Sequence, residues 1–277
     1  MPELSVRLLG PIQALHDGVP VYLGPARQRE VLAVLALRAG TTLSTTQIVD
    51  ALWAPPRPAS ADNMVHCYVG RLRRLLDPIA RRDTASAAVH SSRPGYRLDV
   101  PPDAVDVSLF HRDLRRARAA RAHGELGAAL RLFRQTLRRC HAPFLEEAVG
   151  PLAESERTRL DELRNDVVEE VVGLRLLLGD DADLVSDLRG MLVRQPLRER
   201  LWALLLVTLG QSSRRAEALT AYQDARVTLI ERLGVEPGRE VQDLYLRLLR
   251  NEPVAIRPWW DSLTRPGYAV GDLGKRA

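Results

Sequence analysis

The side chains best suited to a chemical task lie together on one predicted helix, residues 60–76. Projected at about 100° per residue, this segment has an apolar stripe formed by Val65, Val69, Leu72 and Leu76. The opposite side carries Asn63, Cys67, Gly70 and Arg74, flanked by His66, Arg73 and, on the other shoulder, Arg71. Arginine can bond two acceptors of guanine, and asparagine can pair with adenine. The pattern predicts a helix that reads bases in the major groove of DNA.

A basic hairpin follows this helix. Within residues 87–100, Pro94 and Gly95 separate two short arms of alternating apolar residues, which is typical of a turn between strands. Arg93 at the tip and Arg97 on the second arm are placed to contact phosphates or to reach the minor groove. Tyr96 and Leu98 are expected to pack inward.

The elements around the helix decide between two interpretations, because an isolated arginine-rich helix is more often a solvated surface helix. Asp17-Gly18 predicts a turn between short strands, and Pro25 and Gly40 bracket a first helix. A capping box at Ser44–Gln47 opens a second helix, 45–53, and Asp77-Pro78 is expected to end the third. Three strands, near 4–8, 12–14 and 19–23, three helices and a hairpin form a winged helix-turn-helix whose third helix faces the groove.

Every strong periodicity beyond residue 105 is helical. The segments are 106–122, 125–140, 151–178, 182–194, 198–210, 214–233 and 238–250. Their pairing suggests tetratricopeptide-like stacking. The expected fold class is mainly α: a winged helix with small antiparallel sheets, then an all-α helical repeat domain. The expected domains are 1–102 and 103–252, with a hinge at Pro101-Pro102 and a tail, 253–277, that contains Trp259-Trp260.

Charge favours a polyanionic partner for the first third of the chain. Residues 1–100 contain 12 arginines and 8 acidic residues, a net charge of +4, whereas the remaining 28 basic and 27 acidic residues leave +1.

The residues also argue against catalysis. Lys275 is the only lysine and precedes Arg276, so a P-loop has no anchor. Cys67 and Cys140 are predicted free thiols, and their neighbouring histidines point about 100° away along a helix, which prevents chelation by a pair alone. Glu146, Glu147, Glu154 and Glu156 are interpreted as a solvated acidic face. We expect no enzyme activity, no cofactor and no metal.

Nothing in the sequence predicts a membrane location. The start, MPELSVRLLG, has no basic segment followed by an apolar core, and no apolar run approaches the length of a membrane span. A soluble protein of the cytoplasm, associated with the nucleoid, is expected.

Several segments make a family resemblance specific. LSVRLLGPIQAL, ARQREVLAVLALRAG, IVDALW, NMVHCYVGRLRRLL and RPGYRL resemble the OmpR-type winged helix of Streptomyces antibiotic regulatory proteins. PLRERLWALLLVTLG, RRAEALTAYQDAR and ERLGVEPGREVQDLYLRLL resemble the bacterial transcriptional activation domain of that family. The resemblance covers residues 4–252. It implies a transcriptional activator of secondary-metabolite genes that binds direct repeats in double-stranded DNA and recruits RNA polymerase through its sigma factor.

The chain also departs from the family pattern. Asn63-Met64-Val65-His66 stands where Asn-Thr-Leu-Gln is common, and Gly70 stands where serine is usual. The preferred base sequence is therefore expected to differ. Self-association on DNA is a further expectation. The alternative function is a ligand-gated regulator or scaffold whose helical domain holds a peptide or small molecule.

Overall fold

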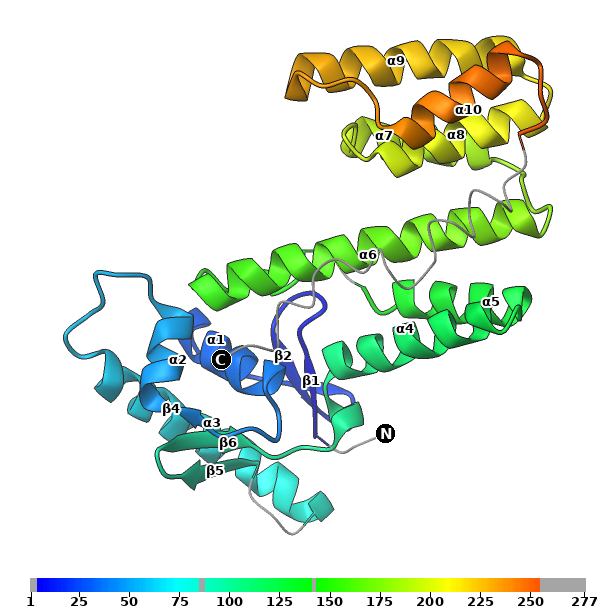
Figure 1. Ribbon diagram of the computed structural model, residues 1–277. Helices are drawn as coiled ribbons and strands as arrows, with labels where there is room; N and C mark the ends of the chain where they lie inside the picture. Colours follow the sequence, from blue (N-terminus) through cyan, green and yellow to red (C-terminus); the bar gives the residue numbers. More distant parts are fainter. Residues whose placement is uncertain (1–3, 85–87, 141–142, 255–277) are drawn as a thin grey trace. The chain divides into compact units, whose positions relative to one another are not determined.

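The structure is a computed structural model that describes residues 4–84, 88–140 and 143–254 (Figure 1). It divides into two compact units, residues 1–167 and 168–277. The domain ranges expected from the sequence do not coincide with these units, and they remain predictions about which segments fold independently. The tail residues 255–277, with Trp259-Trp260, lie outside the described residues.

The first unit opens with the predicted three-stranded sheet. Strands β1 (Leu4–Arg7), β2 (Gln13–His16) and β3 (Val19–Val21) pair antiparallel in this order. Asp17 and Gly18 have φ values of 49° and 83°, so the turn between β2 and β3 uses the left-handed conformations that the Asp-Gly pair favours.

Three helices follow: α1 (Ala26–Leu37), α2 (Thr45–Leu52) and α3 (Ala61–Thr84). The predicted capping box is confirmed, because the Gln47 N–H donates to the Ser44 hydroxyl at 3.1 Å and the Ser44 N–H donates to Gln47 Oε1 at 2.8 Å. The predicted end of the third helix is wrong, since α3 continues through Pro78. Proline removes one N–H from the helix and its ring crowds the carbonyl four residues earlier, but the adjacent Asp77 carboxylate binds the Val89 N–H at 3.1 Å, which ties this turn to the hairpin.

The predicted hairpin is confirmed and forms a second sheet. Strands β5 (Val89–Ser92) and β6 (Gly95–Leu98) pair antiparallel, and the two-residue strand β4 (Leu43–Ser44) pairs with β6 to give the order β4-β6-β5. A Cβ atom on Gly95 would lie 1.8 Å from the Leu43 carbonyl oxygen. Only glycine fits this position, so the hairpin approaches the chain before α2 closely enough to close the winged helix.

The segment after the hairpin is packed, so the predicted hinge at Pro101-Pro102 is wrong. A short 3₁₀ helix, η1 (Pro102–Ala104), leads into α4 (Asp106–Ala122), and Ala104 and Val105 are buried. The Asp106 carboxylate accepts the N–H groups of Leu8 and Leu9 at 2.9–3.0 Å. Helices α5 (Leu126–Leu137) and α6 (Pro151–Leu177) follow, with α4 and α5 forming a helical hairpin.

Within residues 168–254, the second unit contains the rest of α6 and four further helices, which confirms each helix predicted there. These are α7 (Leu184–Arg194), α8 (Glu199–Gln211), α9 (Arg215–Leu233) and α10 (Arg239–Leu249). Residues 201–209 of α8 are all buried, because α7, α9 and α10 cover this helix. A helix that is apolar on every side is stable only in such a position.

Candidate nucleic-acid interface

Helix α3 is amphipathic in the way the sequence predicts. Val65, Val69, Leu72 and Leu76 are at most 1% exposed and pack in the core of the winged helix. The opposite side presents Asn63, His66, Cys67, Arg71 and Arg74, which are exposed, and Gly70, which is half-buried. The apolar stripe therefore fixes the rotation of α3 and turns its polar side outward.

Tyr96 of the wing lies against this polar side rather than inside the core, where it was expected. Its hydroxyl is 2.5 Å from His66 Nδ1, and the two rings meet edge to face. Leu98, two residues later, is fully buried as predicted. Alternation along β6 accounts for the arrangement, because residues 96 and 98 share a face of the strand and only the second of them reaches the interior.

The Arg73 side chain binds the wing. Its Nε donates to the Val89 carbonyl at 3.0 Å, its Nη2 donates to the Ser91 hydroxyl at 2.7 Å, and its guanidinium lies 5.6 Å from the centre of the Tyr96 ring. Of the residues on the polar front and its flanks, Arg73 and His66 thus contact the wing directly. Both orient the wing on α3, a role that the helical projection alone does not reveal.

The two wing arginines have different surroundings. Arg93 is exposed in the turn between β5 and β6. Arg97 donates from Nη2 to Asp99 at 2.9 Å, and His90 Nε2 lies 3.8 Å from the same carboxylate. The positive charge of Arg97 is therefore locally balanced, whereas that of Arg93 faces solvent.

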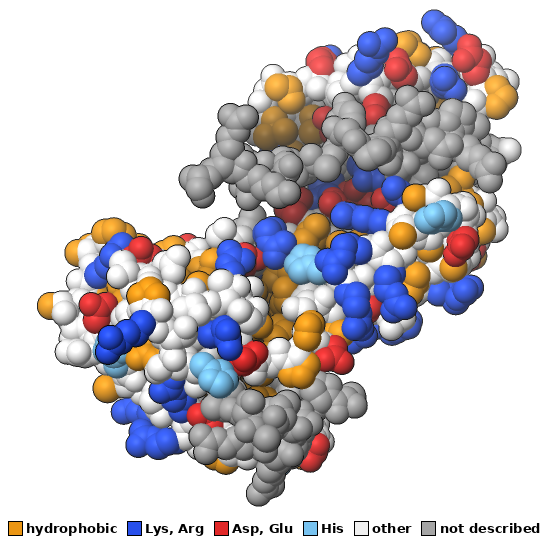
Figure 2. All heavy atoms as spheres, turned by 60° about the horizontal axis from the view of Figure 1, so that its bottom comes forward, with side chains coloured by type: hydrophobic (Ala, Val, Ile, Leu, Met, Phe, Trp, Pro, Cys, Tyr) orange, Lys and Arg blue, Asp and Glu red, His pale blue; other side chains and the backbone are white. Residues whose placement is uncertain are grey.

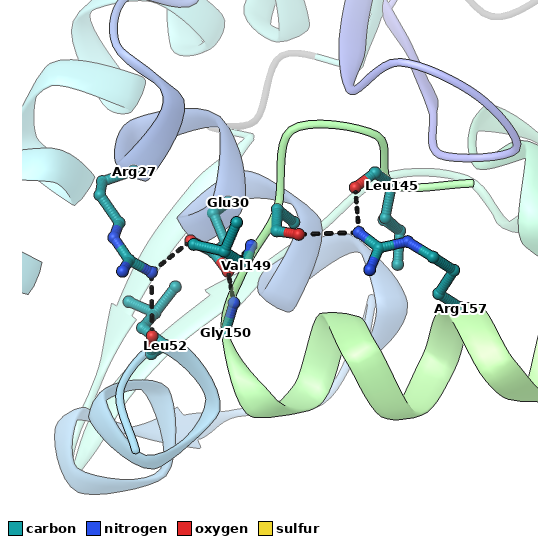
Figure 3. Close-up of polar contacts among 8 residues, drawn as sticks. Arg27, Glu30, Leu52, Leu145, Val149, Gly150 and Arg157 are labelled. Atoms are coloured by element: carbon teal, nitrogen blue, oxygen red, sulfur yellow. Dashed lines mark hydrogen bonds and ion pairs between the residues drawn. The ribbon is translucent and has the colours of Figure 1, made fainter. Parts of the chain in front are cut away.

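A buried carboxylate behind the winged helix was not identified from the sequence. Glu30 of α1 is 1% exposed and accepts the N–H groups of Val149 and Gly150 at 3.1 and 2.5 Å, directly before α6. Arg27 Nη1 donates to its other oxygen at 2.7 Å and to the Leu52 carbonyl at 3.0 Å. Figure 3 shows Glu30 between Arg27 and the start of α6. The sequence signal that could have identified Glu30 is a charged residue at a core position of an otherwise apolar helix.

The loop before α6 is held from its other side by Arg157. The Arg157 guanidinium donates to the carbonyls of Phe144, Leu145 and Ala148 at 2.7–2.9 Å, and Figure 3 shows it reaching toward this loop. Leu145 N–H in turn donates to the Leu8 carbonyl at 3.2 Å. Helices α1 and α6 therefore fix one loop between them, and the loop fixes the N-terminal sheet.

Of the four acidic residues expected to form a solvated face near this loop, Glu146 and Glu154 are exposed as predicted, but the other two are not solvated. Glu156 is 7% exposed and binds Arg159, and Glu147 accepts the Ile12 N–H at 3.3 Å and lies 3.5 Å from Arg29 Nε. They are structural partners of arginines and of the backbone. Among the described residues no group of three His, Cys, Asp or Glu side chains could hold a metal ion, and no helix there is long and apolar enough to span a membrane.

The described residues form a winged helix followed by a helical second part. Residues 20–98 match the family described as "Transcriptional regulatory protein, C terminal", and residues 105–249 match the "Bacterial transcriptional activator domain". The chain belongs to the family of Streptomyces antibiotic regulatory proteins, as its segments had indicated.

Named relatives agree with this assignment. Regulatory protein DnrI of Streptomyces peucetius is 34% identical over 90% of this chain and 93% of its own length. Regulatory protein AfsR of Streptomyces griseus is 35% identical over 92% of this chain, which spans only 25% of that protein. The solved structure of Mycobacterium tuberculosis EmbR in complex with a low-affinity phosphopeptide has a TM-score of 0.88 at 28% identity, covering 95% of this chain and 69% of that one.

Proposed function

We propose that this protein binds duplex DNA through α3 and the wing and activates the transcription of secondary-metabolite genes. The observation that carries the proposal is the exposed polar side of α3, with Asn63, Arg71 and Arg74 opposite a fully buried apolar stripe. Such a helix can enter the major groove without disturbing the core behind it.

The residues divide into three roles. Asn63 and His66 read bases near the start of α3, and Arg71 and Arg74 contact bases or phosphates one to three turns further on. Cys67 and Gly70 are small and allow the helix to approach the groove closely. Arg93 contacts the phosphate backbone, whereas Arg73 and Arg97 shape the wing that carries it.

The protein would act in the cytoplasm, on the nucleoid, at tandem direct repeats. Two copies then bind in the same orientation on one face of the duplex, about 10–10.5 base pairs apart, and they associate with each other on DNA. The helical second part contacts RNA polymerase, including its sigma factor. The names of DnrI and AfsR as regulatory proteins and the activator-domain match support this direction.

Protection mapping of the full chain on upstream regions of neighbouring gene clusters, with and without polymerase, tests the proposal. We expect protected repeats and increased transcription in vitro from the mapped promoter. Asn63→Ala should weaken both at the mapped repeats, by about 1–3 kcal/mol in binding, and Asp50→Ala, a surface change on α2, should leave both unchanged. Repression by the full chain, or activation that is unaffected by the loss of DNA binding, would refute the activator function.

A groove in the second unit favours one alternative, a ligand-gated regulator. A cavity of about 490 Å³ lies between α7, α8 and α9, lined among others by Leu192, Trp202, Leu205 and Thr220. This volume is in the usual range of ligand sites. Thr220 is exposed, so Thr220→Trp would fill the groove without entering the core. If this variant activates transcription as wild type does, the result argues against control by a ligand in the groove. If its activation differs from that of wild type, the result supports the ligand-gated alternative.

A further inference from the structure

A second basic region lies within residues 101–277, whose total net charge is close to zero. Residues 106–140, which include α4 and α5, contain nine arginines and three acidic residues, a net charge of +6. The near-neutral total of residues 101–277 hides this excess because the segments after residue 140 are acidic overall.

Two of the three acidic residues cannot neutralise the surface. Asp106 is engaged with the backbone N–H groups of Leu8 and Leu9. The Asp113 side chain is 4% exposed and binds Arg139 at 3.0 Å. Only Glu125, at the end of the α4–α5 turn, is exposed. The acidic residues of the hairpin itself therefore neutralise little of its positive charge.

The arginines follow the outer sides of the two helices. Arg112, Arg115 and Arg118 are spaced three residues apart along α4, and Arg131, Arg134 and Arg138 repeat at three and four residues along and just beyond α5, so each set shares a helix side. These six residues and Arg116, all exposed, make up the α4–α5 basic face. Figure 2 shows basic side chains gathered over this part of the molecule. In the part of the chain that the structure describes, Arg115, Arg118 and Arg131 have no ion-pair partner.

The environment of His111 supports the charge imbalance independently. Burial first, and then the positive charges of Arg159, Arg115 and Arg118, together lower the pKa of His111 from 6.5 to about 4. Arg159 also donates to His111 Nε2 at 3.2 Å. A histidine surrounded in this way stays neutral at ordinary pH. Arg159 is paired with Glu156, whereas Arg115 and Arg118 keep their charge available to a partner.

We propose that the α4–α5 basic face binds the phosphates of duplex DNA outside the bases read by α3, an inference that rests on the proposed function. Protein partners are usually held by apolar or aromatic anchors at the centre of an interface. Among the described residues, no exposed large hydrophobic side chain lies between residues 106 and 140. Phosphates need only positive charge, and the face belongs to the same compact unit as α3.

Salt dependence of binding by the full chain tests the proposal. We would compare wild type with Arg115→Ala/Arg118→Ala/Arg131→Ala and with a control that removes the same charge from the second unit, Arg232→Ala/Arg239→Ala/Arg247→Ala. Fluorescence anisotropy would be measured on a duplex limited to the mapped site and on one extended at both ends. Each lost phosphate contact lowers the salt slope by about 0.9, so between 50 and 200 mM salt the basic-face variant should lose about 40-fold less affinity than wild type.

The outcomes separate this proposal from the proposed function. It is supported if the basic-face variant binds every extended duplex more weakly, keeps the base preference of wild type and no longer gains from the added flanks, while the control variant behaves as wild type. It is overturned if the basic-face and control variants both have the wild-type salt slope. This includes the case in which the basic-face variant loses only transcription, because the face would then bind an acidic protein. A wild-type chain that binds no duplex DNA overturns both proposals.

Discussion

Replacing Glu30 by alanine tests how the winged helix is joined to α6. The change leaves two backbone donors without their acceptor: the Gly150 N–H, which is buried, and the Val149 N–H, whose residue is 62% exposed and can reach water. A buried donor left unsatisfied costs about 1–3 kcal/mol, and a hydrogen bond to a charged group contributes about 1.5–3 kcal/mol. Arg27 keeps its hydrogen bond to the Leu52 carbonyl and is partly exposed, so the loss of its ion pair with Glu30 adds little to the cost. We expect a loss of about 3–4 kcal/mol.

That loss is a large part of the ~5–15 kcal/mol that stabilises a typical domain. Urea unfolding followed by circular dichroism measures it, and hydrogen exchange of peptides covering residues 144–157 should accelerate first. Glu30→Gln keeps an acceptor oxygen and should cost less than half as much. Asp50→Ala, which removes the exposed ion pair with Arg57, should be close to wild type. A loss below about 1 kcal/mol for Glu30→Ala, or equal losses for the alanine and glutamine variants, would refute the assigned role of the carboxylate.

Three further predictions concern the core, the pH dependence and the wing. Val69→Asp places a charge at a 1% exposed position and should unfold the winged helix, which loss of its cooperative thermal transition would reveal; a folded variant would contradict the assigned rotation of α3. Burial raises the pKa of Asp106 from 3.8 to about 6, against the opposing effect of the Leu9 and Leu8 N–H groups. A pKa raised on folding contributes stability that is complete below pH 3.8 and lost as the pH rises through 6. Asp106→Asn should therefore flatten urea midpoints measured across this window, and an unchanged profile would argue against burial as the cause. Tyr96→Phe removes the hydroxyl next to His66 but keeps the ring beside Arg73, so specific binding should weaken by about 0.5–1.5 kcal/mol with no loss of fold; anisotropy that matches wild type would show that this contact does not orient His66.

Local sequence patterns predicted most of the elements, because their causes are local. The Asp17-Gly18 turn, the Ser44–Gln47 capping box and the apolar spacing of α3 each act over a few residues. The end of α3 was predicted wrongly, since a proline rule that considers one hydrogen bond omits the tertiary contact between Asp77 and Val89. The hinge prediction failed for the same reason: the Asp106 bonds to Leu8 and Leu9 span about a hundred residues.

The candidate interface was predicted as a set of residues but not as an arrangement. Helical projection identifies the side of α3 that faces outward, and the structure places the residues there. It does not reveal that Arg73 and His66 contact the wing, because those contacts join residues 16–30 positions apart in the sequence. The net charges of the two expected domains also concealed the α4–α5 basic face. The excess of arginine appears only in the net charge of the two helices by themselves.

The central claim is that α3 reads bases, and binding-site selection with the full chain tests it most directly. Random duplexes bound by wild type, Asn63→Ala and Arg93→Ala would be sequenced. We expect Asn63→Ala to relax the preference at one position of each repeat by about 1–3 kcal/mol, and Arg93→Ala to weaken all sequences evenly while keeping the motif. An unchanged motif with Asn63→Ala, or a motif altered only by Arg93→Ala, would contradict the assignment of α3 as the reading helix.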